Sequence, residues 1–264
     1  MEENKILFLG TAGDVTSVNK QLRGSGGIVF IYKGNQFHID PGPGSLIRCK
    51  NHGINPRSTL GLIVTNNELC HCSDTNVMIS AMTHDGMDNR GVLIASQSII
   101  DGSESENPIL WKRYRSYLER NIVLKPGERV GINETEIYGI TARTKDPTGM
   151  GLKFVTNNFT IAYTSDTKYS PGVVRNYEDS DILILKLVYP DNNDNSDKLN
   201  VSDAVKIIKE TVPRVAVITG FGSKMISSDP VFVAREIQRE TGVQVFAAHE
   251  GFYINPEQYS KKNF

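Results

Sequence analysis

The sequence predicts an α/β protein in which helices cover two β-sheets. Three observations support this fold class: many short apolar runs have the length of strands, few segments read as long helices, and strand and helix signals alternate in blocks. Strands come first, then a helix, then more strands and two better-marked helices. Because each sheet and each helix must bury an apolar face, this order favours two sheets with helices packed outside them.

The first half of the chain supplies five predicted strands. Gly34-Asn35 separates the second from the third and predicts a tight hairpin turn. Asp40 opens an Asp-Pro-Gly-Pro-Gly segment; because a residue before proline avoids helical geometry, we expect Asp40 to be extended and to bond to nearby turn amides. The five predicted strands cover residues 5–9, 28–33, 36–39, 60–64 and 91–95.

The second half holds six more predicted strands and the two clearest helices. Asn200 predicts the cap of a helix over residues 201–211, and Asp229-Pro230 predicts the start of a helix that Gly242 ends. An earlier helix is predicted over residues 73–82. The six strands cover residues 134–142, 152–155, 159–164, 182–187, 215–219 and 243–247.

Composition argues against several classes of protein. The chain has 29 basic and 30 acidic residues and a formal net charge of −1, so nucleic-acid binding is not indicated, although a local basic groove would escape this count. No segment has the roughly 18 apolar residues of a membrane span, and the acidic start of the chain does not resemble a signal peptide. Three cysteines do not suggest a disulfide framework. We therefore expect a cytoplasmic protein that does not bind a membrane.

Several short segments between the predicted elements carry a more specific signal. A polar loop follows residues 60–64 and contains Asn66, Glu68, Cys70 and His71. Four other segments lie at the ends of predicted strands: Gly10-Thr11-Ala12-Gly13, Asp40-Pro41-Gly42-Pro43-Gly44, Tyr163-Thr164-Ser165-Asp166-Thr167 and Ile218-Thr219-Gly220-Phe221-Gly222.

In their order and spacing these segments resemble ribonuclease-Z-like proteins of the metallo-β-lactamase superfamily. That family has D-P-G-P-G, S-G-D-T and T-H-F-G blocks at the corresponding places, and its loop after the strand reads His-x-His-x-Asp-His. The resemblance covers nearly the whole chain and implies a single domain over residues 1–264 with an αββα sandwich fold. It also implies a site for two metal ions, on loops at one edge of the two sheets, that serves a hydrolase.

Most of the metal ligands that the resemblance implies are replaced in this chain. His71 and the bridging Asp166 remain, whereas the segment 143–146 lacks the histidine expected there and Gly220 offers no side chain. Because a catalytic zinc needs about three protein ligands and an open position, we do not expect the usual two-metal hydrolysis. The residues at these vestigial positions are Asn66, Glu68, Cys70, His71, Asp166 and Gly220.

One zinc ion could still find suitable ligands. A thiolate, an imidazole and a carboxylate form a good zinc set, and Glu68 or His249 would supply a fourth ligand. Adjacent side chains such as those of Cys70 and His71 often point apart, which argues against such a zinc site. The alternative, which we favour, is that Cys70 and Cys72 are small buried residues that fill a vacated metal pocket, as free cysteines commonly do. The three candidate metal ligands are Cys70, His71 and Asp166.

Three functions follow from the sequence. The favoured one is a catalytically inactive scaffold or interaction subunit, which would act with a protein partner or as a homo-oligomer. The second is a mononuclear metal-dependent hydrolase of phosphodiesters or thioesters that uses the three candidate ligands. The third is a metal-free module that binds a small anion near Arg143 or Lys145. Apart from this one zinc ion, no cofactor is expected.

Overall fold

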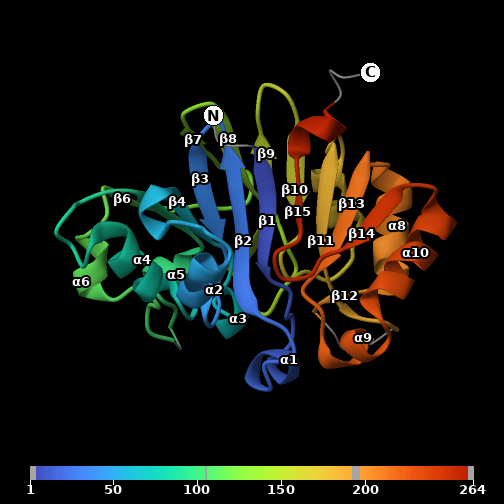
Figure 1. Ribbon diagram of the computed structural model, residues 1–264, viewed down its shortest axis with the longest axis horizontal. Coiled ribbons are helices and arrows are strands. Elements are labelled where there is room, and N and C mark those ends of the chain that lie inside the picture. Colours follow the sequence, from blue (N-terminus) through green and yellow to red (C-terminus); the bar gives the residue numbers. More distant parts are fainter. Residues whose placement is uncertain (1–3, 105, 192–196, 261–264) are drawn as a thin grey trace.

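Two mixed β-sheets stand at the centre of the protein, each with helices on its outer side (Figure 1). The computed structural model describes residues 4–104, 106–191 and 197–260. In spatial order, the strands of the first sheet are β15 (Tyr253–Ile254), β1 (Lys5–Gly10), β2 (Ser25–Tyr32), β3 (Asn35–Ile39), β4 (Thr59–Val64), β5 (Val92–Ala95) and β6 (Arg120–Val123). Those of the second are β14 (Gln244–Ala247), β13 (Val215–Thr219), β11 (Ile182–Tyr189), β10 (Thr160–Tyr163), β9 (Met150–Val155), β8 (Thr135–Thr141) and β7 (Arg129–Ile132), with β12 (Leu199–Asn200) paired to β11.

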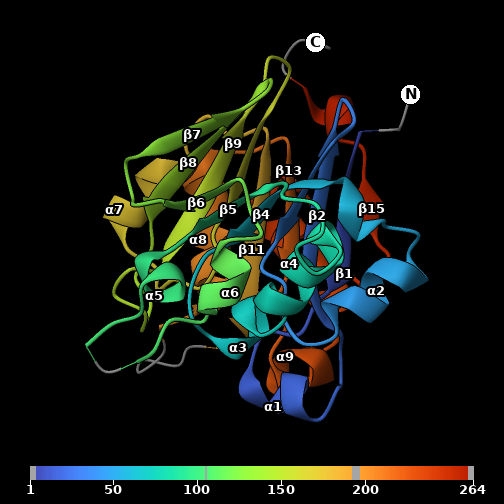
Figure 2. The ribbon, with the colours of Figure 1, turned by 90° about the vertical axis from the view of Figure 1, so that its left-hand side faces the viewer.

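The helices divide between the two outer faces and one edge of the sandwich. Those beside the first sheet in Figures 1 and 2 are α2 (Ser45–Asn51), α4 (Thr75–Thr83), α5 (Gln97–Ile100) and α6 (Lys112–Arg115). Those beside the second sheet in Figure 1 are α8 (Val201–Thr211) and α10 (Pro230–Thr241). The remaining helices are α1 (Val15–Asn19), α3 (Leu69–Cys72), α7 (Pro171–Val174) and α9 (Ser223–Ser227), with 3₁₀ turns at Pro56–Ser58, Arg175–Tyr177 and Pro256–Tyr259. Within the described ranges, no helix has both the length and the apolarity that crossing a membrane requires.

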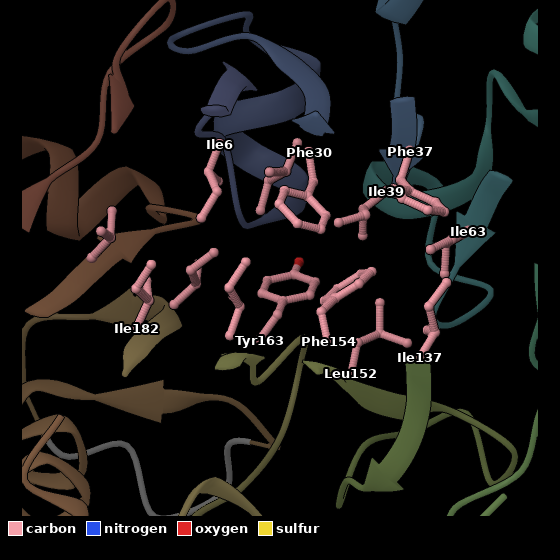
Figure 3. Close-up of a cluster of buried hydrophobic side chains, with 14 of the residues drawn as sticks. Ile6, Phe30, Phe37, Ile39, Ile63, Ile137, Leu152, Phe154, Tyr163 and Ile182 are labelled. Carbon is pink, nitrogen blue, oxygen red and sulfur yellow. The ribbon is translucent and has the colours of Figure 1, made fainter. Parts of the chain in front are cut away.

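The main core lies between the facing sides of the two sheets. Figure 3 shows side chains from both sheets meeting there, with aromatic rings at the centre. Phe30 of β2 and Phe154 of β9 meet edge to face, with 5.4 Å between ring centroids, which is the favoured geometry for an aromatic pair. The labelled residues are Ile6, Phe30, Phe37, Ile39 and Ile63 from the first sheet and Ile137, Leu152, Phe154, Tyr163 and Ile182 from the second.

The direction of the parallel strands places the loops that carry the candidate site residues at one edge of the sandwich. β3 and β4 are parallel in the first sheet, and β10, β11 and β13 are parallel in the second. The carboxyl ends of parallel strands lie at the same edge of a sheet, which is where ligand sites form in open sheets of this kind. A bridge between Ala12 and Phe221 joins the two sheets at this edge, where Figure 1 also shows α1, α3 and α9.

The C-terminal segment ties the two sheets together. β14 belongs to the second sheet, but the chain then crosses to the first, where β15 pairs antiparallel with β1. Beyond it, the Glu257 carboxylate accepts hydrogen bonds from Asn4 at the start of β1 and from Asn158 in the loop between β9 and β10. One carboxylate therefore holds groups from both sheets.

The predicted elements are largely confirmed. All eleven predicted strands occur, with ends within three residues of those expected. The two C-terminal helices begin where their caps predict, because the Asn200 side chain accepts a hydrogen bond from Asp203 N and the Asp229 side chain accepts one from Val231 N. The short strands β6, β7, β12 and β15 were not predicted, since four or fewer residues give no clear periodicity.

Two local predictions were wrong, and one short helix was not predicted. The hairpin turn lies at Lys33-Gly34, one residue earlier than expected, and both residues have the positive φ (49° and 78°) of a type I′ turn. The helix expected over residues 73–82 is α4, which begins two residues later than expected, and the short helix α3 before it was not predicted. Asp40 is not extended: its φ is 53°, a left-handed conformation that Asp tolerates better than most residues.

Candidate functional site: two buried lysines among the predicted ligands

The three candidate metal ligands do meet in space. Cys70 and His71 belong to α3, and Asp166 follows β10 at the same edge of the sandwich. One ligand atom from each residue lies within 4.8 Å of those of the other two. The expectation that the adjacent Cys70 and His71 point apart was therefore wrong, because the tight α3 turn aims both side chains towards Asp166.

The ammonium group of Lys186 contacts all three of these side chains. Lys186 lies in β11 and is only 3 % exposed. Its Nζ is 3.5 Å from Cys70 Sγ and 2.9 Å from Asp166 Oδ2, and it also contacts His71 Nε2. A cation of the protein itself thus stands among the atoms that a zinc ion would need.

Gly220 provides the space through which Lys186 reaches the site. Gly220 has a φ of 65°, and a Cβ atom built on it would lie 2.2 Å from Lys186 Cγ, far inside van der Waals contact. Any side chain at position 220, including the histidine that the resemblance implies, would collide with the lysine stem. The glycine and the lysine are therefore sterically matched to each other.

A second lysine lies on the other side of Asp166. Lys198 Nζ is 2.8 Å from Asp166 Oδ2 and 2.6 Å from Glu68 Oε2, and Lys198 is 8 % exposed. Asp166 Oδ2 therefore accepts hydrogen bonds from both ammonium groups. The two cations share one carboxylate oxygen, as two metal ions share a bridging aspartate.

Asp40 orients the histidine from the opposite side. Its Oδ2 is 2.7 Å from His71 Nδ1 and accepts a hydrogen bond from the Tyr163 hydroxyl at 3.0 Å. Its Oδ1 accepts from the backbone N–H of Thr65 at 2.8 Å. Asp40 was expected to bond to amides of its own turn, but it links β3, β4, α3 and β10 instead.

The charges of the site support one another. Asp40, Glu68 and Asp166 supply three carboxylates, which face the ammonium groups of Lys186 and Lys198 and the His71 ring. Such a buried network is stable only when every charge has a partner, because each charge has lost its hydration. Removing any one member leaves its buried partners with less compensation.

Burial and neighbouring charges shift the pKa values in opposite directions. Burial alone would raise the pKa of Asp166, but Lys186, Lys198 and His71 outweigh it and hold this pKa well below its usual range. Burial and Lys186 would lower the pKa of His71, but the carboxylates of Asp40 and Asp166 raise it well above its usual value. Burial would likewise raise the pKa of the Cys70 thiol, but the charges of Lys186 and His71 outweigh burial and lower this pKa below its usual value.

The raised pKa of His71 predicts a pH dependence of stability. The folded protein holds this proton more tightly than the unfolded chain, in which histidine titrates near about pH 6.5. The stabilisation is therefore complete below that pH and is lost as the pH rises through the folded pKa. Urea unfolding at a series of pH values should show this decline, and the curve of a His71→Gln variant should be flatter. Parallel curves for the two proteins would contradict the prediction.

The other vestigial positions hold the loop together. Asn66 is buried; its Nδ2 donates to Ser165 Oγ at 3.2 Å and its Oδ1 accepts from the Glu68 N–H at 3.0 Å. His249, proposed as a fourth metal ligand, is exposed and contacts the Glu250 carbonyl. Cys72 is fully buried, as the apolar alternative predicts, but Cys70 is only half buried.

In the segment 143–146, where a histidine is expected, Asp146 has the structural role. It is buried and accepts hydrogen bonds from the Asn67 and Thr148 N–H groups and from the Ser98 hydroxyl. It thereby joins the loop after β4, helix α5 and the loop before β9. Its neighbour Lys145 is exposed and lies at a surface cleft.

Sequence reasoning missed both buried lysines. For Lys186 a signal was present: a single charged residue interrupts the apolar run Ile182–Tyr189, and a lysine in a fully buried strand must have a partner. Lys198 gave no such signal, because it lies in a polar stretch far along the chain from Glu68 and Asp166.

Two hollows adjoin the site. A cleft of about 920 Å³ extends from Glu68 and Lys198 past α1 and the loop at Lys145 to the surface. A much smaller cavity of about 30 Å³ lies inside, against Lys186 and Gly220. Among the described residues, Cys70 alone lines both.

Comparisons with known proteins agree with this architecture. No family model matches the chain. An uncharacterized protein of Methanocaldococcus jannaschii is 29 % identical over 252 residues, which cover 95 % of this chain and 94 % of the relative. The crystal structure of the metallo-β-lactamase fold protein YhfI from Bacillus subtilis superposes with a TM-score of 0.79 at 16 % identity, over 96 % of this chain and 99 % of that one.

A second solved structure covers the whole length as well. The short form of human tRNase Z has a TM-score of 0.67 at 13 % identity, over 95 % of this chain and 98 % of that one. At such identities the likeness establishes the fold and leaves the activity open. The fold expected from the sequence motifs is confirmed: the chain has the metallo-β-lactamase fold.

Proposed function

We propose that the protein acts without a metal ion, as a binding scaffold in which two lysine ammonium groups take the place of two metal ions. One observation carries the proposal: Lys186 Nζ lies among Cys70 Sγ, His71 Nε2 and Asp166 Oδ2. Zinc binds such atoms at about 2.0–2.3 Å through the same lone pairs that face the ammonium group. The lysine and the ion cannot occupy this place together, so the residues present do not fit a resident metal.

The cleft beside the lysines is the natural place for a ligand or a partner segment. Its volume of about 920 Å³ lies in the range of small-molecule sites, and exposed Val15 and Leu69 give its wall apolar surface. Its charge does not favour a small anion, because the lining carboxylates outnumber its two ammonium groups, Lys145 and Lys198. A protein partner or second copy of the chain therefore accounts for the site better than an anion does.

The mononuclear hydrolase is the second candidate. The observation that favours it is the mutual proximity of the Cys70, His71 and Asp166 ligand atoms. It requires Lys186 to leave the position in which it neutralises Asp166, and the displaced ammonium group would then lose its carboxylate partner. We therefore rank it below the metal-free scaffold.

Metal content tests the proposal directly. We expect protein purified without chelator to contain no stoichiometric zinc or iron by elemental analysis, and calorimetric titration with zinc to show no binding at this site. In the Lys186→Ala variant the three ligand atoms become free, so zinc should bind. Lys198→Ala is the matched control: it also removes a buried ammonium group, but it leaves Lys186 in place and should bind no zinc.

Two results would overturn the proposal. One is a zinc ion bound stoichiometrically by the unmodified protein and lost in a Cys70→Ser variant. The other is equal zinc affinity in the unmodified protein and the Lys186→Ala variant, which would mean that the lysine does not control the site. Circular dichroism on each variant shows whether it remains folded, so that a lack of binding is not read from unfolded protein.

A further inference from the structure

Cys70 stands at the boundary between the two hollows. Its sulfur is 3.5 Å from Lys186 Nζ on the inner side, and the half-buried side chain also faces the large cleft. A molecule that enters the cleft can therefore reach this sulfur, beside the network members Glu68 and Lys198 that line the same cleft. The remaining two cysteines are buried away from the cleft, Cys49 in α2 and Cys72 in α3.

The inner cavity offers a hydrogen-bond donor that nothing in the fold uses. Ser25, the first residue of β2, lines this cavity, is 3 % exposed, and its hydroxyl has no hydrogen-bond partner among the described residues. A buried unpaired hydroxyl is costly, so its presence needs an explanation. Lys186, whose ammonium group contacts the cavity-lining Cys70 and His71, lines the cavity as well.

The size of the inner cavity limits what it can hold. About 30 Å³ accommodates a water molecule, which needs on the order of 10–15 Å³ by the same measure, but it does not accommodate an extended group. It therefore suits a single oxygen atom with the Ser25 hydroxyl and the Lys186 ammonium beside it. Whatever carries that oxygen must have its larger part in the cleft.

We propose that Cys70 is the nucleophile of a metal-independent acyl transfer, with an acyl thioester as substrate. The acyl chain and the leaving thiol lie in the cleft, and the carbonyl oxygen points into the inner cavity towards Ser25 Oγ and Lys186 Nζ. Donors placed where negative charge develops on that oxygen stabilise the tetrahedral intermediate. The proposal rests on the metal-free site, because a bound zinc would engage the same sulfur.

The reaction balances without a further reactant. The Cys70 sulfur forms a bond to the acyl carbon, and the bond from that carbon to the sulfur of the substrate breaks. The proton of the Cys70 thiol passes to the departing thiolate, which leaves as a free thiol. Water then hydrolyses the new thioester, which releases a carboxylic acid and restores the Cys70 thiol. No atom changes its oxidation state.

The test uses the full chain and a simple probe, the acetyl thioester of N-acetylcysteamine. We expect the intact mass to increase by one acetyl group, and peptide mapping to place that group on Cys70. The Cys70→Ser variant should remain unmodified under these conditions, whereas Cys72→Ala should be acetylated as the unmodified protein is. Cys49 and Cys72 act as internal controls, since burial raises the pKa of each thiol to about 12.

A second variant separates the inner cavity from the general reactivity of the thiol. Ser25→Ala removes the unpaired hydroxyl, so acetylation should slow by on the order of 10²-fold, the usual effect of losing one oxyanion donor. Alkylation of Cys70 by iodoacetamide develops no oxyanion and should proceed at an unchanged rate. This pair of rates is a readout that a purely structural role of Ser25 would not produce.

Each outcome has one meaning. Absence of both acetyl-Cys70 and released N-acetylcysteamine, in protein that is alkylated normally, overturns the acyl transfer, as does acetyl transfer at equal rates in unmodified protein and Ser25→Ala. Acetylation of Cys49 or Cys72 in preference to Cys70 also overturns it. Metal analysis of the same samples keeps the two proposals apart: zinc-free protein without acetylation contradicts only the acyl transfer, whereas stoichiometric zinc contradicts the metal-free function.

Discussion

Replacing Asp166 by asparagine is expected to lower the free energy of unfolding by about 3–5 kcal/mol, the usual loss when one member of a buried charge network is removed. Asp166 is the shared partner of Lys186, Lys198 and His71. Without its charge, Lys186 keeps no carboxylate partner among its described contacts, and Lys198 keeps Glu68. Urea unfolding of the Asp166→Asn variant at neutral pH measures the effect.

The matched control is Asp88→Asn. Asp88 also pairs with a basic side chain, Arg57, but this ion pair lies at the surface, where solvent screens it. The control should unfold nearly as the unmodified protein does. Equal effects of the two substitutions would mean that the buried network contributes no more than an ordinary surface pair.

Replacing Gly220 by alanine is the second large effect that we expect. The left-handed φ of 65° costs an alanine roughly 1–2 kcal/mol. Crowding of the new Cβ against Lys186 Cγ, 2.2 Å away, adds about 1–3 kcal/mol of overpacking. The Gly242→Ala variant isolates the first contribution, because Gly242 has a similar φ of 73° and a Cβ atom added there would have nothing within 4 Å.

A double-mutant cycle then measures the contact itself. Lys186→Ala removes the stem against which the new methyl group packs, so the double variant should lose less stability than the two single variants together. The expected coupling is about 1–3 kcal/mol, in the range found for residues in direct contact. Strict additivity would show that Gly220 and Lys186 are independent, and the idea of a matched pair would fail.

The fold was predictable from the sequence where the local signal was strong. Apolar runs such as Ile182–Tyr189 and capped helices such as Val201–Thr211 are defined by nearby residues alone. The hairpin at Lys33-Gly34 was displaced by one residue because Gly34 fits either central position of the turn. β15 was missed because two residues become a strand only through pairing with β1.

The sequence predicted which residues meet at the site better than it predicted the chemistry of the site. The motif positions identified Cys70, His71 and Asp166, which the fold brings together. They could not show that Lys186 and Lys198 fill the space between them, since the lysines come from β11 and from the segment before β12. Charge complementarity of this kind depends on tertiary distances that no sequence spacing encodes.

The crossing of the C-terminal segment between the sheets bears on how the chain folds during synthesis. β1 leaves the ribosome before any other strand described, but its partner β15 follows every other strand. Until residues 253–254 emerge, the outer edge of β1 has unpaired backbone groups, and such an open edge invites pairing with other chains. Because contacts so distant in sequence also form slowly, we expect the nascent protein to depend on protection of this edge until translation is nearly finished.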